Sequence, residues 1–196
     1  TQQVMGEISF RNGVLSIQRR RYRVRKGVFV VAIGKCASEA ASALAARLGE
    51  GLRGGFVLDI KQCQIKGMEC WQGTHPMPSA QNVAATQKLV QVLQELDRDD
   101  FVVFAISGGG STLLCLPPKD ADWQDEAKVL EALFHHGADI KDINTVRKHL
   151  SLARGGYLAQ YVHPAKGVAL LFSDVPGDDM AYIASGPTIR DNTTAA

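Results

Sequence analysis

The chain has 196 residues, of which 45% are hydrophobic and 21% are charged, and its formal net charge is +2. This composition is typical of a globular protein, long enough for one substantial core but short for two independent domains. No apolar run approaches the roughly 20 residues that cross a bilayer, and the net charge is too small to indicate a nucleic-acid partner. We therefore expect a single cytoplasmic domain over residues 1–196 that binds neither membrane nor nucleic acid.

Two features could suggest other functions. Residues 19–26 (RRRYRVRK) are very basic, but Tyr22 and Val24 alternate with the charges, which favours an exposed strand with one solvated face over a nucleic-acid-binding arm. None of the four cysteines belongs to a C-x-x-C pair. We therefore expect reduced thiols rather than disulfides or a zinc site.

The N-terminal part predicts a hairpin followed by a strand-helix unit. Asn12-Gly13 favours a type I′ turn between short β-prone segments within residues 8–25. Residues 28–33 form an apolar run that is typical of a buried strand, and the alanine-rich residues 38–48 favour a helix that packs closely on a sheet.

Gly34-Lys35 stands between that strand and that helix. An ammonium group at the end of a buried strand could meet a phosphate group or the charge that develops during phosphoryl transfer. A surface lysine is the other interpretation. The G-x-x-x-x-G-K-[ST] spacing of a Walker A lysine is absent.

Two further strands and a rigid loop follow. Residues 55–60 and 68–71 favour strands. The loop at residues 73–79 contains two prolines that fix its backbone, so it could aim Thr74 or His75 at a site, although a purely structural turn explains it equally well.

A long helix is expected next. Ser79 is a favoured N-cap residue, and the helix should run to about Leu96. Ala85, Leu89, Val92 and Leu96 then share one apolar face. This helix should cover the sheet.

The most informative stretch is residues 101–112. Six apolar residues predict a strand that is covered on both faces, and three glycines then remove every Cβ from the turn, so that backbone N–H groups can surround an anion. A tight turn without a ligand is an equally good interpretation of such a short motif. The candidate phosphate- or substrate-binding residues of this motif are Ser107, Gly108, Gly109, Gly110 and Ser111.

Two helices should follow the glycine motif. One covers residues 122–135, and another covers residues 145–152, capped by Asp142 or Asn144. Arg147 and Lys148 would then lie on the first turns of the second helix, with Asn144 one turn earlier. These groups suit a carboxylate or phosphate, although a solvated helix face explains two adjacent bases nearly as well.

The C-terminal part predicts a short helix at residues 157–162 and a last buried strand at residues 167–172. The polar loop after this strand contains Asp174 and Asp178, which could hold Mg²⁺ or act as a base on a hydroxyl group. Turn chemistry around Pro176-Gly177 is the alternative explanation for these aspartates.

Alternating strands and helices predict a three-layer α/β fold with a mainly parallel sheet and a peripheral N-terminal hairpin. Ligands bind beyond the carboxyl ends of the strands in such sheets. Three polar loops, at residues 34–35, 107–112 and 173–179, are expected at such ends. Their convergence predicts a binding site there.

Five stretches together resemble the glycerate 2-kinase family whose members carry a MOFRL domain and were formerly often called hydroxypyruvate reductases. They occur in the order of that family and extend over nearly the whole chain. The matching stretches are residues 34–37, 73–78, 106–114, 144–151 with Gly155-Gly156, and 173–179 followed by residues 185–188.

The resemblance implies a Rossmann-like N-terminal domain and an activity that uses ATP and Mg²⁺ to phosphorylate D-glycerate at its 2-hydroxyl group, giving 2-phosphoglycerate. It implies catalytic roles for Lys35, Arg147, Asp174 and Asp178, where Arg147 meets the substrate carboxylate or a phosphate and the aspartates serve metal or hydroxyl activation. The residues implied in substrate or phosphate binding are Gly34, Asn144, Lys148 and the 107–111 motif.

The same resemblance implies that the chain stops before the MOFRL domain, so that half of the interdomain cleft is missing and the isolated chain turns over poorly. A non-catalytic domain that binds sugar acids or nucleotides is the main alternative. A hydroxypyruvate reductase is a weaker one, because the Gly-x-Gly-x-x-Gly motif is absent after the first strand. Whether the protein forms a homo-oligomer stays open.

Overall fold

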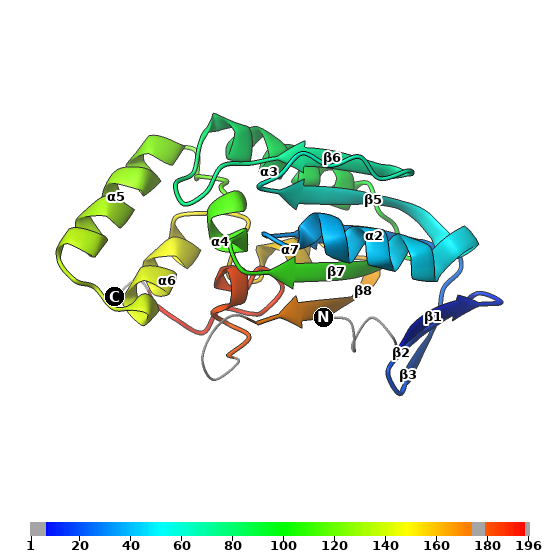
Figure 1. The fold of residues 1–196 in the computed structure, drawn as a ribbon. Coiled ribbons are helices and arrows are strands. Elements are labelled where there is room, and N and C mark those ends of the chain that lie inside the picture. Colours follow the sequence, from blue (N-terminus) through cyan, green and yellow to red (C-terminus); the bar gives the residue numbers. More distant parts are fainter. Residues whose placement is uncertain (1–6, 174–178, 195–196) are drawn as a thin grey trace.

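A five-stranded parallel sheet forms the centre of the molecule in the computed structural model, which describes residues 7–173 and 179–194 (Figure 1). The strand order is β6-β5-β4-β7-β8. The candidate residues Asp174 and Asp178 lie outside the described residues. The strands are β4 (Val28–Ile33), β5 (Leu52–Asp59), β6 (Met68–Gln72), β7 (Phe101–Ser107) and β8 (Lys166–Phe172).

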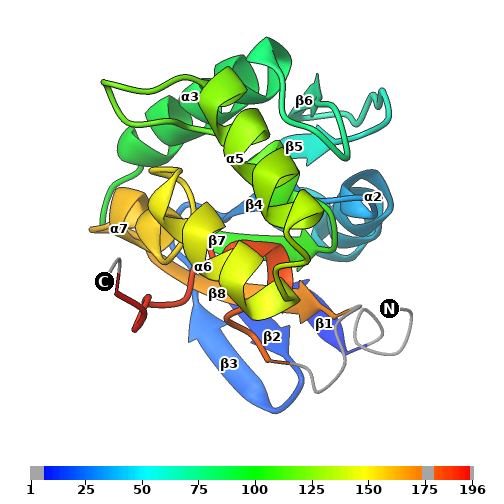
Figure 2. The same ribbon diagram turned by 90° about the vertical axis from the view of Figure 1, so that its left-hand side faces the viewer.

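Helices cover both faces of this sheet (Figure 2). α2 (Ala37–Leu48) packs on one face through its alanines and leucines, while α3 (Ala80–Gln94) and α7 (Tyr157–Val162) pack on the other. All seven residues of β7 are buried, because β7 has strands on both sides and a helical layer on each face. The predicted three-layer α/β architecture is confirmed.

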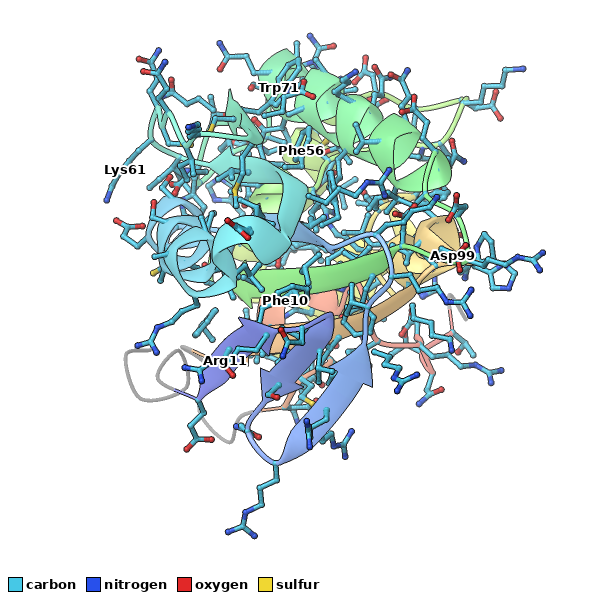
Figure 3. All side chains as sticks on the ribbon, turned by 90° about the vertical axis from the view of Figure 1, so that its right-hand side faces the viewer. Phe10, Arg11, Phe56, Lys61, Trp71 and Asp99 are labelled. Atoms are coloured by element: carbon cyan, nitrogen blue, oxygen red, sulfur yellow. The ribbon has the colours of Figure 1, made fainter. Side chains whose placement is uncertain are left out.

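The N-terminal hairpin is also present and continues into a third strand. β1 (Ile8–Arg11), β2 (Val14–Ile17) and β3 (Arg20–Arg23) form a separate antiparallel sheet (Figure 3). Asn12 and Gly13 have φ angles of 49° and 71°, as a type I′ turn requires. The arginine run therefore lies mostly on the solvated β3.

Aromatic contacts stabilise the packing of the two sheets and the pairing of strands within the large sheet. The Tyr22 ring of β3 lies 5.1 Å from the Phe101 ring of β7, which docks the small sheet on the large one. Phe56 and Trp71, on the neighbouring strands β5 and β6, stack with a ring separation of 6.4 Å (Figure 3). Such pairs add to the free energy of burial of their rings.

The order of the strands decides where a ligand can bind. From β4 the chain moves outward to β5 and β6, then returns across the sheet to place β7 on the other side of β4. The direction of winding thus reverses between β4 and β7, and in open parallel sheets the crevice beyond the carboxyl ends at such a point is the usual ligand site. Both glycine-containing turns predicted from the sequence follow these two strands.

Two helices lie beyond the carboxyl ends of the strands: α5 (Trp123–His135) and α6 (Ile140–His149) (Figure 1). α5 confirms the helix predicted over residues 122–135, and Asp122 is its N-cap residue. The predicted start of α6 was wrong, because Asp139 rather than Asp142 or Asn144 accepts the first free N–H groups of the helix. α6 therefore begins five residues earlier than predicted.

The earlier start of α6 changes the expected positions of its two cations within the helix. Arg147 and Lys148 lie in its last turn rather than its first, where positive charge interacts favourably with the helix dipole. Asn144 lies inside the helix, and its amide donates to the Ile140 carbonyl at 2.9 Å. An asparagine that makes this bond cannot serve as the helix cap.

The apolar face of α3 also differs from the predicted one. Leu93 is fully buried where Val92 was expected, because the buried face continues through the polar residues Asn82 and Thr86. The remaining short helices are η1 (Gly49–Gly51), α4 (Gly110–Leu113) and η2 (Ile183–Ser185).

Two expectations about the whole chain can be compared with the structure. All four cysteines are free, as predicted. Among the described residues, no helix has the length and apolar character that crossing a membrane would require.

Candidate functional site

The turns after β4 and β7 are joined directly. The N–H of Lys35 donates to the Gly108 carbonyl at 2.9 Å, and the N–H of Cys36 donates to Ser107 Oγ at 3.2 Å. Gly34 has a φ angle of +119°, and a Cβ at this position would lie 2.3 Å from Ser107 Oγ. Only glycine allows the two strand ends to approach so closely.

The glycine turn that follows β7 is an open arrangement of donors. Gly109 has a φ angle of +84°, which curls the backbone before α4. In the part of the chain that the structure describes, the backbone N–H groups of Gly109, Gly110 and Ser111 donate no hydrogen bond. Successive N–H groups in such a turn form a concave anion site.

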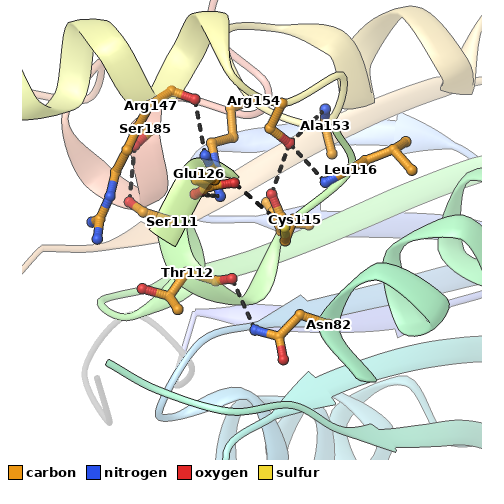
Figure 4. Close-up of polar contacts among 12 residues, drawn as sticks. Asn82, Ser111, Thr112, Cys115, Leu116, Glu126, Arg147, Ala153, Arg154 and Ser185 are labelled. Carbon is orange, nitrogen blue, oxygen red and sulfur yellow. Dashed lines mark hydrogen bonds and ion pairs between the residues drawn. The ribbon is translucent and has the colours of Figure 1, made fainter. Parts of the chain in front are cut away.

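The Ser111 hydroxyl belongs to a buried chain of polar groups. Ser185 Oγ lies 2.9 Å from Ser111 Oγ and 2.9 Å from Asn144 Oδ1, so it links α4 to α6 (Figure 4). The structure thus brings the predicted residues Ser111 and Asn144 together through Ser185, which was not predicted as a site residue. In the sequence its only signal was its place in the 185–188 motif.

Two titratable side chains lie against the glycine turn, and a third acts on one of them by its charge. A Cβ on Gly109 would lie 2.9 Å from Lys35 Cγ and 3.4 Å from His75 Cδ2, so both side chains lie against the turn. The pKa of His75 is lowered by partial burial of the ring and by the charges of Lys35 and Arg147. The charge of Arg147, which lies on α6, therefore reaches the His75 ring beside the glycine turn.

A buried ion pair, Arg154 with Glu126, supports the backbone of Arg147. Arg154 Nη1 donates to the Arg147 carbonyl at 2.9 Å, and Arg154 Nη2 pairs with Glu126 Oε1 of α5 at 2.7 Å (Figure 4). Burial and the neighbouring Arg154 lower the pKa of the Arg147 guanidinium, and Glu126 opposes that shift. The cluster holds two guanidinium groups and one carboxylate, so an anion at Arg147 would balance its charge.

The Arg147 side chain has unused hydrogen-bonding capacity. Its Nε is buried and has no partner among the described residues. A planar guanidinium with free donors suits a carboxylate or phosphate.

Lys148 lies on another side of α6. Its ammonium pairs with Asp191 at 3.2 Å, its side chain is only 5% exposed, and it lies 5.9 Å from the centre of the Tyr182 ring. It lines a groove of about 930 Å³ that also includes Gly155 and His163. The structure does not bring Lys148 to the glycine turn, and its role in ligand binding stays a prediction.

The loop that carries His75 is fixed by Asn82. The Asn82 side chain accepts the Thr74 N–H at 2.8 Å and donates to the Thr74 and Thr112 carbonyls at 3.0 and 2.9 Å (Figure 4). Thr112 Oγ1 also donates to the Pro76 carbonyl at 3.2 Å. The 73–79 loop is therefore tied to α4 on both sides of His75.

A metal site is not formed by the described residues alone, since none of their His, Cys, Asp and Glu side chains gather in a group of three or more. The carboxylates predicted for Mg²⁺, Asp174 and Asp178, lie outside the described residues. The predicted ligand roles of all these residues remain predictions. The geometry places a glycine turn with free N–H groups, together with Lys35 and His75, at the topological switch point of a Rossmann-like domain.

The chain belongs to the family described as "Domain of unknown function (DUF4147)", whose sequence profile matches residues 2–196. It is 40% identical over 171 residues to D-glycerate 2-kinase from Thermotoga maritima, covering 86% of this chain and 41% of the relative. It is 42% identical over 176 residues to an Agrobacterium vitis protein named as a hydroxypyruvate reductase, covering 89% of this chain and 40% of the relative.

A solved structure confirms the fold. A crystal structure of a Pyrococcus horikoshii protein matches with a TM-score of 0.90 and 32% identity, over 97% of this chain and 43% of that chain. The resemblance to the N-terminal domain of the glycerate 2-kinase family is thereby confirmed. The chain spans about two fifths of the length of these relatives.

Proposed function

We propose that this chain forms the phosphate- and substrate-binding domain of a glycerate 2-kinase, which transfers a phosphoryl group from ATP to the 2-hydroxyl group of D-glycerate. One observation carries the proposal: Lys35 lies against the open glycine turn at the switch point between β4 and β7, and the charge of Arg147 acts on His75 beside it. The kinase name of the Thermotoga maritima relative supports the reaction.

Phosphoryl transfer depends mainly on the placement of reactants and on the neutralisation of charge, and the groups around the glycine turn suit both tasks. The free N–H groups of Gly109, Gly110 and Ser111 would receive a phosphate, and the Lys35 ammonium would offset its charge. The Arg147 guanidinium would pair with the glycerate carboxylate through two parallel hydrogen bonds. Gly34 and Ser107 keep the two turns in contact.

Mg²⁺ would neutralise phosphate charge when bound with the nucleotide. Its candidate ligands in this chain are Asp174 and Asp178, which follow β8 in the sequence. We include Mg²⁺ in the proposal on the chemistry of these oxygen ligands and of phosphoryl transfer.

We further propose that catalysis needs more than these 196 residues, because the relatives that bear kinase names are more than twice as long. A second domain would close the crevice over the substrate, so we expect the isolated chain to bind anions weakly and to turn over poorly. The free cysteines fit a cytoplasmic location, which we also propose.

The test is a chimera in which this chain replaces the matching segment of Thermotoga maritima D-glycerate 2-kinase. With ATP, Mg²⁺ and D-glycerate, we expect it to form 2-phosphoglycerate. Lys35→Met should reduce kcat/KM at least about 100-fold, because it removes a charge that stabilises the transferring group. Lys166→Met is the matched control, since Lys166 is exposed at the start of β8, at the opposite edge of the sheet.

The outcomes separate the candidate functions. Ligand-induced stabilisation by D-glycerate or ATP without phosphoglycerate formation would favour a non-catalytic binding domain. Oxidation of NAD(P)H with hydroxypyruvate would favour a reductase. Equal activity of Lys35→Met and Lys166→Met would contradict the assigned site.

A further inference from the structure

His75 lies against the glycine turn but has so far no role in the proposed kinase reaction. It reaches the turn from the 73–79 loop, whereas Lys35 reaches it from the end of β4. Both lie within contact distance of a Cβ built on Gly109. A group bound by the free N–H groups of this turn would therefore lie beside the imidazole ring.

The position of His75 is fixed by contacts on both sides of it. Asn82 holds Thr74 through the Thr74 N–H and carbonyl groups, and Thr112 holds the Pro76 carbonyl. Asn82 is itself fully buried in α3. Such bracing of the neighbouring backbone places an otherwise exposed ring at a defined distance from the turn, as a catalytic group requires.

Partial burial and nearby charges favour the neutral form of the His75 ring. Burial lowers the pKa of the imidazole most, and the charges of Lys35, on the β4–α2 turn, and Arg147, on α6, lower it further. At neutral pH the ring then has a free lone pair and can accept a proton. Histidine in this state is a common general base.

We propose that His75 is the catalytic base of the reaction, a step that rests on the proposed kinase function. The neutral imidazole accepts the proton of the substrate hydroxyl while the oxygen attacks the terminal phosphorus of a nucleoside triphosphate. The new oxygen-phosphorus bond forms, the bond from that phosphorus to the bridging oxygen breaks, and the nucleoside diphosphate leaves with those electrons. The imidazolium releases its proton to solvent after product departure.

Lys35 and Arg147 contribute to this step through the same geometry. Their charges favour the anionic substrates and also hold the base in its neutral form before reaction. Once the triphosphate and the carboxylate are bound, these cations are neutralised, which raises the affinity of His75 for a proton at the moment when it must accept one.

The test uses the chimera described above with His75→Gln and, as a matched control, His163→Gln. His163 also precedes a proline, but it lies at the end of α7 and lines the groove beside Lys148. We expect His75→Gln to lower kcat by about 100- to 10,000-fold with little change in KM, and His163→Gln to leave both unchanged. The acid limb of the kcat-pH profile should disappear only in His75→Gln.

An independent measurement on this chain alone distinguishes failure of the base assignment from failure of the kinase assignment. In an NMR titration of the imidazole C–H signals, inorganic phosphate or D-glycerate should raise the pKa of His75, because the anion neutralises Lys35 and Arg147. His163 should not respond. Lys35→Met should raise the pKa of His75 without any ligand.

Retention of kcat within about threefold by His75→Gln, or a loss confined to KM, would overturn the base assignment, and the first result would direct attention to Asp174 or Asp178. A His75 signal that ignores both anions would overturn it as well. If the chimera with the native chain makes no phosphoglycerate while the His75 signal responds to the anions, the kinase proposal fails and the anion site stands.

Discussion

The buried ion pair behind Arg147 should be one of the most sensitive points of the fold. Glu126 is 1% exposed and Arg154 is 0% exposed, and their side chains meet at 2.7 Å. Glu126→Gln keeps the shape of the side chain but leaves the Arg154 guanidinium buried without a counter-ion. Removal of one partner of such a pair costs about 3–5 kcal/mol, a large part of a typical stability of about 5–15 kcal/mol.

Urea denaturation of the isolated chain measures this change in free energy. We expect the transition midpoint to fall with an unchanged slope, and the melting temperature to fall by about 6–20 °C for a protein of this size. Glu39→Gln is the matched control, because Glu39 pairs with Lys61 at 3.4 Å on the surface. Loss of an exposed pair costs about 0–1 kcal/mol.

The double variant Glu126→Leu/Arg154→Met tests the physical cause. It removes both charges, and only the hydrogen bonds from Arg154 to the Arg147 carbonyl and from Cys115 Sγ to Glu126 are lost without replacement. We expect it to be more stable than Glu126→Gln, within about 1–3 kcal/mol of the native chain. A Glu126→Gln loss below about 1 kcal/mol, or a double variant less stable than the single one, would refute the assignment of a buried charge pair.

Three further changes test the local structure. Gly34→Ala should cost at least about 2 kcal/mol in urea denaturation, because a Cβ would meet Ser107 Oγ at 2.3 Å and φ is +119°; a native-like midpoint would contradict this geometry. Asn82→Ala should cost about 2–3 kcal/mol by leaving buried partners unpaired, and unchanged stability would show that the loop is not braced by this residue. Burial raises the pKa of Cys63 to about 11, so iodoacetamide at pH 8 should modify the exposed Cys36 first in a mass-spectrometric time course, and the reverse order would contradict the burial of Cys63.

Much of the candidate site follows from short stretches of sequence. The apolar runs before residues 34 and 107 predicted strands, and the glycines after them predicted close turns, because these properties depend on adjacent residues. The start of α6 was harder to predict, since Asp139, Asp142 and Asn144 are all reasonable caps. The hydrogen bonds from the N–H groups of Lys141 and Asp142 to the Asp139 side chain decided between them.

The sequence by itself determined which residues stand at strand ends and that a glycine turn with hydroxyl groups follows the most apolar strand, because hydrophobic periodicity and turn chemistry are local. The tertiary structure alone decided that β7 lies beside β4, and this pairing joins the Gly34 turn to the Gly108 turn across more than 70 residues of sequence. It also brought His75 to the glycine turn, placed Arg147 near enough for its charge to act on His75, and buried Glu126 with Arg154. Such encounters depend on the order of strands in the sheet, which no local pattern specifies.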